Sequence, residues 1–167
     1  MPPLVFLGLG SNLGDRPAAL ETAVRRLEAR GIGVSRRSST WQTEPVGGPP
    51  QGWFLNAVVA GETALSPEEV LTACLDTERE MGRVREEKDG PRLIDVDILL
   101  FGDERRDGPG LVIPHPRLHE RRFVLEPLHE IAPDLRHPVL RLTVSELRDR
   151  CPDTSAVRLF SPAGVTA

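Results

Sequence analysis

Two acidic residues, Asp95 and Asp97, interrupt an otherwise apolar run at residues 93–101. In an extended strand alternate side chains share a face, so the two carboxylates point the same way with Cα atoms roughly 6.6 Å apart. Such a pair can converge on one or two cations. Hard oxygen ligands suit Mg²⁺, which completes its octahedron with water and substrate phosphates. The pair therefore predicts Mg²⁺ chemistry on a phosphorylated substrate.

The acid pair also has a structural interpretation, in which each carboxylate pairs with an arginine or lies at the wet edge of the sheet. Alternation predicts two apolar groups on opposite faces of the strand: Leu93, Leu99 and Phe101 beside the acids, and Ile94, Val96, Ile98 and Leu100 on the other face. Two unpaired charges buried there would be strongly destabilised by desolvation. Arg83, Arg85 and Arg92 stand just upstream, and guanidinium groups are the preferred bidentate partners of phosphate. Acids and arginines together favour Mg²⁺-nucleotide chemistry.

A second basic cluster lies at residues 115–122, where three arginines and two histidines accompany one acid, Glu120. His115 stands between Pro114 and Pro116, which fix the backbone and reduce the entropy lost when the imidazole is held in place. A histidine inside a basic cluster is a candidate phosphate or ribose contact.

Two weaker candidates for ligand contact lie nearer the N-terminus. Phe54 and Asn56 share a strand face, so the amide can read the edge of a flat heterocycle that stacks on the ring, although each aromatic residue taken singly is interpreted as core. The glycine-rich segment 8–15 matches neither GxGxxG nor GxxxxGK[ST]. A plain tight turn is the favoured interpretation of this segment, ahead of a phosphate cradle.

Capping signals and periodicity predict the elements that must position these residues. A buried strand at 3–10 precedes a helix that begins after the N-cap Asp15 and ends at Gly31. Strand candidates follow at 32–43 and 53–64, joined by a Pro/Gly loop. Ser66, Pro67 and Glu69 form a capping-box signature, which predicts a second helix to about residue 81.

The acid-bearing strand at 90–102 completes the order β-α-β-β-α-β. This order is typical of a ferredoxin-like sandwich, an α+β fold in which two helices cover one face of an antiparallel sheet. Downstream we expect an extended piece at 111–116 and helices at 121–133 and 143–151, the last with a capping box from Thr143 to Glu146. We expect one domain over residues 1–167, with a frayed tail at 161–167.

Composition excludes several classes of function. The formal charge of −4 offers no general attraction to a nucleic-acid backbone, and no apolar run approaches the roughly 20 residues of a membrane-spanning helix. The two cysteines, Cys74 and Cys151, are too few for a disulfide scaffold and lack metal-ligand spacing. We expect a cytoplasmic protein, monomeric, that acts on small molecules.

The segments LGLGSNLGD, TEPVGG, FLNAVV, GRVR, GPRLIDVDILLFG and IPHPRLHERRFVLEPLHEIAP, in this order and spacing, resemble the 6-hydroxymethyl-7,8-dihydropterin pyrophosphokinases of folate biosynthesis. The resemblance spans about residues 4–138, and GPRxxDxD followed by apolar residues is its most specific part. It implies transfer of the β,γ-pyrophosphoryl unit of ATP to the hydroxymethyl group of the pterin. The products would be AMP and the pterin diphosphate.

The resemblance also implies roles for individual residues. Asp95 and Asp97 would hold two Mg²⁺ ions on the triphosphate, and Arg83 and Arg92 would be catalytic together with them. The residues implied at the ATP site are Glu78, Arg83, Arg85, Arg92, Ile98, His115 and Arg121. The residues implied at the pterin site are Thr43, Val46, Gly47, Phe54, Asn56, Asp95 and Phe123. The segments 44–52 and 83–91 correspond to loops that are expected to close over substrate and exclude water.

Three residues depart from the family pattern, and two other functions stay open at this point. Asp89 stands where many members have an aromatic residue, Glu86 replaces a basic residue, and Gly110 stands where some have an arginine. These differences concern loop closure and adenosine contacts. The open alternatives are another Mg²⁺-dependent nucleotidyl or phosphoryl transferase, and a ferredoxin-like binding module in which the acids merely pair with arginines.

Overall fold

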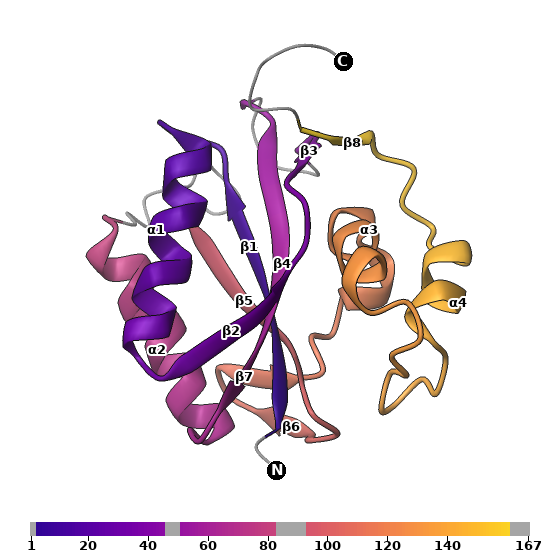
Figure 1. Cartoon of the computed structure of the whole chain (residues 1–167). Helices are drawn as coiled ribbons and strands as arrows, with labels where there is room; N and C mark the ends of the chain where they lie inside the picture. The colour runs from indigo at the N-terminus through magenta and orange to yellow at the C-terminus, as the bar shows by residue number, and fades with distance from the viewer. Residues whose placement is uncertain (1–2, 46–50, 83–92, 161–167) are drawn as a thin grey trace.

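The computed structural model describes residues 3–45, 51–82 and 93–160 (Figure 1). Its strands are β1 (Leu4–Ser11), β2 (Ile32–Arg37), β3 (Trp41–Thr43), β4 (Phe54–Thr63), β5 (Asp95–Phe101), β6 (Arg106–Gly108), β7 (Leu111–Ile113) and β8 (Val157–Leu159). Its helices are α1 (Arg16–Ala29), α2 (Pro67–Glu80), α3 (Arg122–Ile131) and α4 (Val144–Asp149), with a 3₁₀ turn, η1, at Leu118–Glu120. The expected extended piece and downstream helices are thereby confirmed. The residues of the expected tail, 161–167, lie outside the described ranges.

The main sheet is antiparallel, with the order β5-β1-β4-β3-β8. Strand β2 also pairs with β4, at residues 59–63, whereas β3 pairs with residues 54–56. The expected strand at 32–43 is thus two short strands that share one edge of β4. Read through β5, β1, β4 and β2, this is the order of a ferredoxin-like βαββαβ unit, which confirms the α+β prediction. The small hairpin of β6 and β7 and the edge strand β8 are additions to that unit.

Local capping explains why the helices of the sandwich begin where they do. The Asp15 carboxylate accepts a hydrogen bond from the Ala18 amide at 3.1 Å, and Gly31, with φ of 101°, ends the turn after α1. Ser66 and Glu69 exchange hydrogen bonds of 2.9 and 3.1 Å at the start of α2. Thr143 and Glu146 form the same box at α4. The sequence predictions for these boundaries are confirmed.

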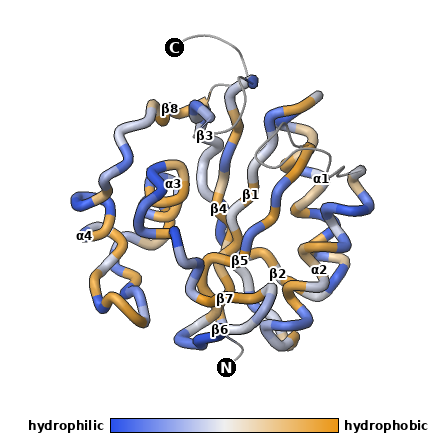
Figure 2. The backbone as a smooth tube through the Cα atoms, turned by 180° about the vertical axis from the view of Figure 1, so that it is seen from behind, coloured by the Kyte–Doolittle hydropathy of each residue, from blue (hydrophilic) through white to orange (hydrophobic). Residues whose placement is uncertain are grey.

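The helices form a layer on each side of the sheet (Figure 1). Helices α1 and α2 cover one face, over a core that includes Leu7, Leu27 and Ile98. Helix α3 covers the other face, over a core that includes Phe6, Leu99 and Leu125, and α4 packs against the outer side of α3. Apolar residues are concentrated on the central strands and on the inner sides of the helices (Figure 2). Helix α3 covers only part of its face, which leaves room for a cavity beside it.

An irregularity in β5 changes which residues share the face of the acids. The register between β1 and β5 shifts between Phe6 and Leu7, so that Leu99 is an extra residue in the ladder. Beyond it the alternation is inverted, because Leu100 packs in the core under α3 whereas Phe101 packs in the core under α2. The prediction that Phe101 shares the face of the acids and Leu100 the opposite face was wrong.

Candidate functional site

The main cavity of the described chain has a volume of about 600 Å³ and lies between the sheet and the start of α3. Its walls come from segments far apart in the sequence: the second half of β1, the first halves of β4 and β5, and the segment that leads into α3. Of the residues expected to contact ligands, the cavity brings together Thr43, Phe54, Asn56, Asp95, Asp97, Arg121 and Phe123. The cavity therefore brings together both expected metal ligands and most of the expected pterin contacts, but, among the described residues, only Arg121 of the expected nucleotide contacts.

Strand pairing lines these residues up across the sheet. Asp95 pairs with Gly10 of β1, and Gly10 pairs with Asn56 of β4. Directly paired residues of an antiparallel sheet point to the same face, so an acid, a glycine and an amide form one row across the three strands. A second row consists of Asp97, Gly8 and Val58.

The two glycines of β1 form the floor of the cavity. A Cβ atom at Gly10 would lie 2.7 Å from Asn56 Oδ1, closer than side-chain atoms approach one another. A Cβ atom at Gly8 would meet Leu99 at 3.4 Å, which is ordinary contact, but it would project into the cavity between the acids and β4. Alternate glycines thus let a ligand lie against the backbone of β1.

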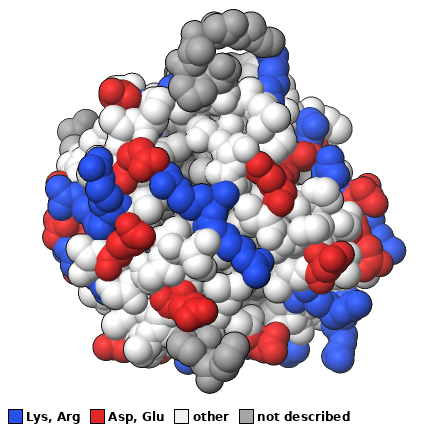
Figure 3. Space-filling view, in the orientation of Figure 1, with Lys and Arg blue, Asp and Glu red and all other residues white. Residues whose placement is uncertain are grey.

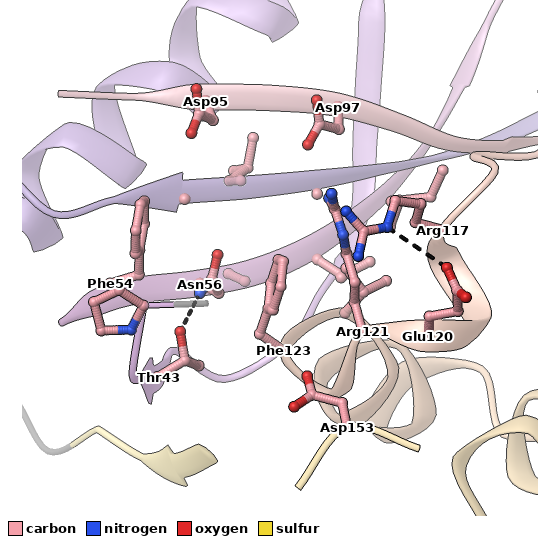
Figure 4. Close-up of a pocket in the computed structure, with 18 of the residues that line it drawn as sticks. Thr43, Phe54, Asn56, Asp95, Asp97, Arg117, Glu120, Arg121, Phe123 and Asp153 are labelled. Atoms are coloured by element: carbon pink, nitrogen blue, oxygen red, sulfur yellow. Dashed lines mark hydrogen bonds and ion pairs between the residues drawn. The ribbon is translucent and has the colours of Figure 1, made fainter. Parts of the chain in front are cut away.

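The two acids open into this cavity rather than into the protein interior. Their carboxylates point the same way from β5, as the strand period predicts (Figure 4). Asp97 is exposed and Asp95 is half-buried, so the expectation of a buried pair was wrong, and so was the desolvation cost derived from it. The missing side chains at Gly8 and Gly10 are the physical reason, because they leave the acids beside open space. Among the described residues none forms an ion pair with Asp97.

An aromatic slot lies on the other side of the cavity. Phe54 and Phe123 stand on either side of a gap, and Asn56 lies at its base (Figure 4). The Asn56 Nδ2 group donates a hydrogen bond to Thr43 Oγ1 at 2.6 Å. Both polar residues are buried, with exposed fractions of 8% and 2%. A flat ring could stack in the slot while this pair reads its hydrogen-bonding edge.

Arg121 supports the slot from behind. Its guanidinium lies 5.5 Å from the centre of the Phe123 ring, on the side away from Phe54 (Figure 4). This is a cation–π contact, which holds the ring while the cation remains at the cavity wall near Asp97.

His115 lies in a neighbouring cavity of about 400 Å³, between the β6–β7 hairpin and residues 137–140. Its Nδ1 atom accepts a hydrogen bond from the Arg117 amide at 3.1 Å, so the neutral ring carries its proton on Nε2. Burial lowers the pKa of His115 below its ordinary value; the charge of Asp97 opposes this shift, while Arg121 and Arg117 add to it. The ring therefore offers a neutral N–H donor at neutral pH.

Two expected ATP contacts have their side chains outside the cavity. Glu78 is buried on α2, and its carboxylate accepts a hydrogen bond of 2.8 Å from the Val96 amide at the outer edge of β5. The Ile98 side chain is packed in the core beneath α1 and α2. Val46, Gly47, Arg83, Arg85 and Arg92 lie outside the described residues, as do Glu86 and Asp89. Gly110 lies in the turn between β6 and β7 with φ of 82°.

The glycine-rich segment has a role that the sequence interpretation missed. Asn12 Nδ2 donates hydrogen bonds to Gln51 Oε1 at 2.7 Å and to the Gly52 carbonyl at 3.1 Å. Arg16, at the start of α1, donates to the Trp53 carbonyl at 2.8 Å. The turn after β1 therefore anchors the segment that leads into the aromatic slot. The alternation of Gly8 and Gly10 along the strand was the signal in the sequence that this segment also borders a cavity.

Other cavity residues were not predicted as contacts: Gly8, Gly10, Pro152 and Asp153. Glu44, Pro45, Gln51, Arg117 and Glu120 were not predicted individually, although they belong to the segment 44–52 and the basic cluster 115–122 that the sequence singled out. Asp153 comes from the segment before β8, and its carboxylate accepts a hydrogen bond from the Arg122 amide at 3.0 Å, at the start of α3. It thereby ties the C-terminal segment to the helix that carries Phe123.

On the face seen in Figure 3 acidic and basic side chains are interspersed, apart from one short diagonal run of basic side chains near the centre. In the described part of the chain, no helix has both the length and the apolar character needed to span a membrane.

An α+β sandwich that directs two carboxylates, an arginine and an aromatic slot into one cavity is the arrangement expected of a phosphoryl-group transferase that acts on a flat heterocycle. Residues 6–133 match the family model of 7,8-dihydro-6-hydroxymethylpterin-pyrophosphokinase (HPPK). The chain belongs to this family, whose members are ATP-dependent pyrophosphokinases of folate synthesis.

Curated relatives support the assignment. The 2-amino-4-hydroxy-6-hydroxymethyldihydropteridine pyrophosphokinase of Methylorubrum extorquens is 50% identical over 131 residues, which are 78% of this chain and 83% of the relative. The Bacillus subtilis enzyme of the same name is 45% identical over 132 residues, 78% of this chain and 79% of that one. The folic acid synthesis protein fol1 of Schizosaccharomyces pombe is 41% identical over 95% of this chain, which spans only 22% of that longer protein.

Solved structures show the same fold. An HPPK-DHPS in complex with substrates superposes with a TM-score of 0.72 over 89% of this chain and 43% of that one, at 13% identity. The Plasmodium falciparum HPPK-DHPS with pterin and p-hydrobenzoate gives 0.68 over 90% and 44%, at 19% identity. At these identities the likeness concerns the fold alone.

Proposed function

We propose that this protein transfers the β,γ-pyrophosphoryl unit of ATP to the hydroxymethyl group of 6-hydroxymethyl-7,8-dihydropterin through the cavity described above. The observation that carries the proposal is the row from Asp95 through Gly10 to Asn56. Asp95 and Asn56 lie on one face of the sheet, on the two strands that flank β1, and Gly10 between them has no side chain. This arrangement supports Asp95 as a metal ligand and Asn56 as a contact to the ring. ATP bound at the acids and the pterin bound in the slot would therefore meet over β1.

The acceptor would lie between Phe54 and Phe123. A pterin is flat and has amide-like donors and acceptors along one edge, which Asn56 and Thr43 can pair with at the base of the slot (Figure 4). The aromatic faces supply binding energy, and the buried polar pair supplies selection against rings that lack this edge. Arg121 would hold Phe123 in its stacking position.

The donor set of the acids fits Mg²⁺. In the described part of the chain no three His, Cys, Asp or Glu residues are grouped closely enough to form a complete metal cage. A pair of carboxylates open to a cavity matches an ion that takes one or two protein ligands and completes its shell with water and phosphate oxygens. When bound, Mg²⁺ would neutralise charge on the triphosphate and polarise the β-phosphate. We propose that Asp95 and Asp97 would hold two such ions.

The chain's own residues would then align the reaction. The hydroxymethyl oxygen forms a bond to the β-phosphorus while the bond from that phosphorus to the α–β bridging oxygen breaks, so AMP leaves and the hydroxyl proton passes to solvent. The transition state of such transfers is loose, so positioning and charge neutralisation suffice and no strong general base is required. His115 would donate its Nε2–H to a phosphate oxygen, and Arg121 would offset charge beside Asp97.

The main chain of β5 would contribute to the adenosine end. This strand is at the edge of the sheet, and its Val96 amide already faces outward to Glu78. Two residues further on, Ile98 would present its main-chain groups at the same edge, where an adenine could pair with them. The implied roles of Glu78 and Ile98 would thus be served through the backbone of β5.

The finer assignments of compartment and assembly are also proposals. Both cysteines are free, and Cys74 is buried, as is usual in a reducing compartment. We therefore place the protein in the cytoplasm, as a monomer of one domain. Gel filtration at working concentration tests the assembly: elution at twice the monomer mass would contradict it.

The proposed transfer is tested by the identity of the nucleotide product. The protein is mixed with ATP, Mg²⁺ and 6-hydroxymethyl-7,8-dihydropterin, and the products are resolved by ³¹P NMR and chromatography. AMP and a pterin diphosphate in equal amounts are expected. ADP with a pterin monophosphate would instead indicate a phosphoryl transferase of the ordinary kind. The same mixture without pterin should yield neither product.

A further inference from the structure

Arg117 lines the main cavity together with Arg121, and both stand beside the 3₁₀ turn η1. The backbone around Arg117 is held in place by hydrogen bonds and by core packing. The His115 amide donates to the Leu99 carbonyl of β5 at 2.9 Å, and Leu118 is 1% exposed in the core beneath α3. The Arg117 amide donates to His115 Nδ1. The main chain of Arg117 is thus fixed against β5 while its side chain reaches toward the cavity.

The side chain of Arg117 has only a weak partner among the described residues. Its Nε atom lies 3.5 Å from Glu120 Oε1, and the two side chains are 59% and 46% exposed. An exposed pair at this distance contributes little to stability and is easily exchanged for a better partner. Glu120 is therefore a weak ion-pair partner that Arg117 can readily exchange for another anion.

The surroundings favour an anion at this wall of the cavity. The guanidinium groups of Arg117 and Arg121 both lie below Asp97 (Figure 4), so two positive charges stand at the same wall, where one anion can interact with both. Two other cavity acids are already engaged elsewhere. Glu44 accepts the Ala156 amide at 2.7 Å, and Asp153 accepts the Arg122 amide at 3.0 Å.

We propose that Arg117 is a phosphate-binding residue of this site, in addition to the arginines that the resemblance implies, and that Glu120 competes with the nucleotide for it. The inference rests on the proposed function, because ATP supplies the phosphate. In the free protein Arg117 pairs with Glu120. When the triphosphate lies at the acids, Arg117 leaves Glu120 and donates hydrogen bonds to a phosphate oxygen, which binds a guanidinium more strongly than an exposed carboxylate does.

Binding of Mg²⁺ and α,β-methylene ATP, measured by calorimetry, tests both halves of the proposal. Arg117→Gln should weaken binding about tenfold, and the loss should shrink at high salt. Glu120→Gln should strengthen binding about threefold, because the competitor for Arg117 has lost its charge. Arg25→Gln and Glu28→Gln, on the exposed side of α1, change the net charge by the same amounts and should leave affinity unchanged.

The double variant R117Q/E120Q separates this competition from a general charge effect. It should bind like R117Q, because Glu120 acts only through Arg117. If the gain of E120Q persists without Arg117, or if R117Q binds like the wild type, the inference is wrong while the proposed function stands. If the wild-type protein does not bind the analogue at all, the proposal that ATP is the pyrophosphoryl donor is wrong, and the inference about Arg117 is wrong with it. Circular dichroism of each variant establishes that it is folded.

Discussion

The Asn56 Nδ2 group donates a hydrogen bond to Thr43 Oγ1 at 2.6 Å at the base of the aromatic slot. This bond fixes which side of the amide faces the slot, so Thr43→Val should disturb recognition more than folding. We expect a loss of about 1 kcal/mol in unfolding free energy and a rise of about tenfold in the KM for the pterin. Steady-state kinetics with varied pterin, together with urea unfolding, measure the two effects.

Thr63→Val is the matched control for this prediction. Thr63 is also buried, and its hydroxyl donates to the Gly31 carbonyl at 2.8 Å, at the far end of β4 from the cavity. It should lose similar stability with an unchanged KM. An equal rise in the KM of both variants would mean that the slot responds to general loosening of β4, and not to Thr43.

Alanine substitutions at Gly8 and Gly10, on the cavity floor, should distinguish a steric effect on Asn56 from simple filling of the cavity. Gly10→Ala places a methyl group 2.7 Å from Asn56 Oδ1, so the amide must move and kcat/KM should fall about 10²-fold. Gly8→Ala meets no clash, so stability should be kept while kcat/KM falls about tenfold, because its methyl group occupies space beside Asp97.

Gly108→Ala controls for the loss of glycine itself, because a Cβ atom there has nothing within 4 Å. Its kinetics and melting temperature should match those of the wild type. Full activity of Gly8→Ala would show that substrates do not approach β1 at this point, and the proposed meeting place of donor and acceptor would have to move.

Asp97→Asn should abolish turnover without unfolding the protein. The amide keeps the shape of the side chain but is a poor ligand for Mg²⁺, so kcat should fall by about 10³-fold or more. Because Asp97 is exposed, the unfolding free energy should change by less than about 0.5 kcal/mol. Turnover at a series of Mg²⁺ concentrations measures the first effect, and urea unfolding measures the second.

Asp103→Asn, at the exposed turn after β5, removes the same charge outside the cavity and should behave as the wild type. If Asp97→Asn retained half of the wild-type activity at saturating Mg²⁺, the assignment of this carboxylate as a metal ligand would have to be abandoned.

The shared face of Asp95 and Asp97 could be predicted because strand alternation is local. Their exposure could not, since it depends on Gly8 and Gly10 of another strand, which only pairing brings alongside. The extra residue at Leu99 was equally hidden, because a bulge is defined by its partner strand rather than by its own residues.

Capping illustrates the same division between local and distant contacts. The boxes at Ser66 and Thr143 were visible because both partners lie within four residues. The hydrogen bond from the Arg122 amide to Asp153 joins residues 31 positions apart, and no local sequence pattern predicts it. Arg117 lay inside a recognised basic cluster, yet its place in the cavity depends on how η1 is anchored to β5.

His137 should make stability depend on pH. It is 5% exposed, and its Nδ1 atom accepts hydrogen bonds from the Val139 and Leu140 amides at 3.2 and 3.0 Å. Burial lowers the pKa of His137 in the folded protein, and the neighbouring His119 adds to the shift. The unfolded chain therefore binds more protons below its ordinary pKa of about 6.5, so the unfolding free energy is highest above that pH and falls as the solution is acidified.

His137→Asn keeps an acceptor for the turn but cannot be protonated, so it should flatten this dependence. Urea unfolding at pH 7.5, 6.5 and 5.5 (about one-unit steps around the ordinary pKa) should show a smaller decline than in the wild type. Part of the decline should remain, because the pKa of His115 is lowered too. His129→Asn, on α3, is the control and should decline as the wild type does. Parallel curves for the wild type and His137→Asn would show that this buried imidazole is not the group that titrates.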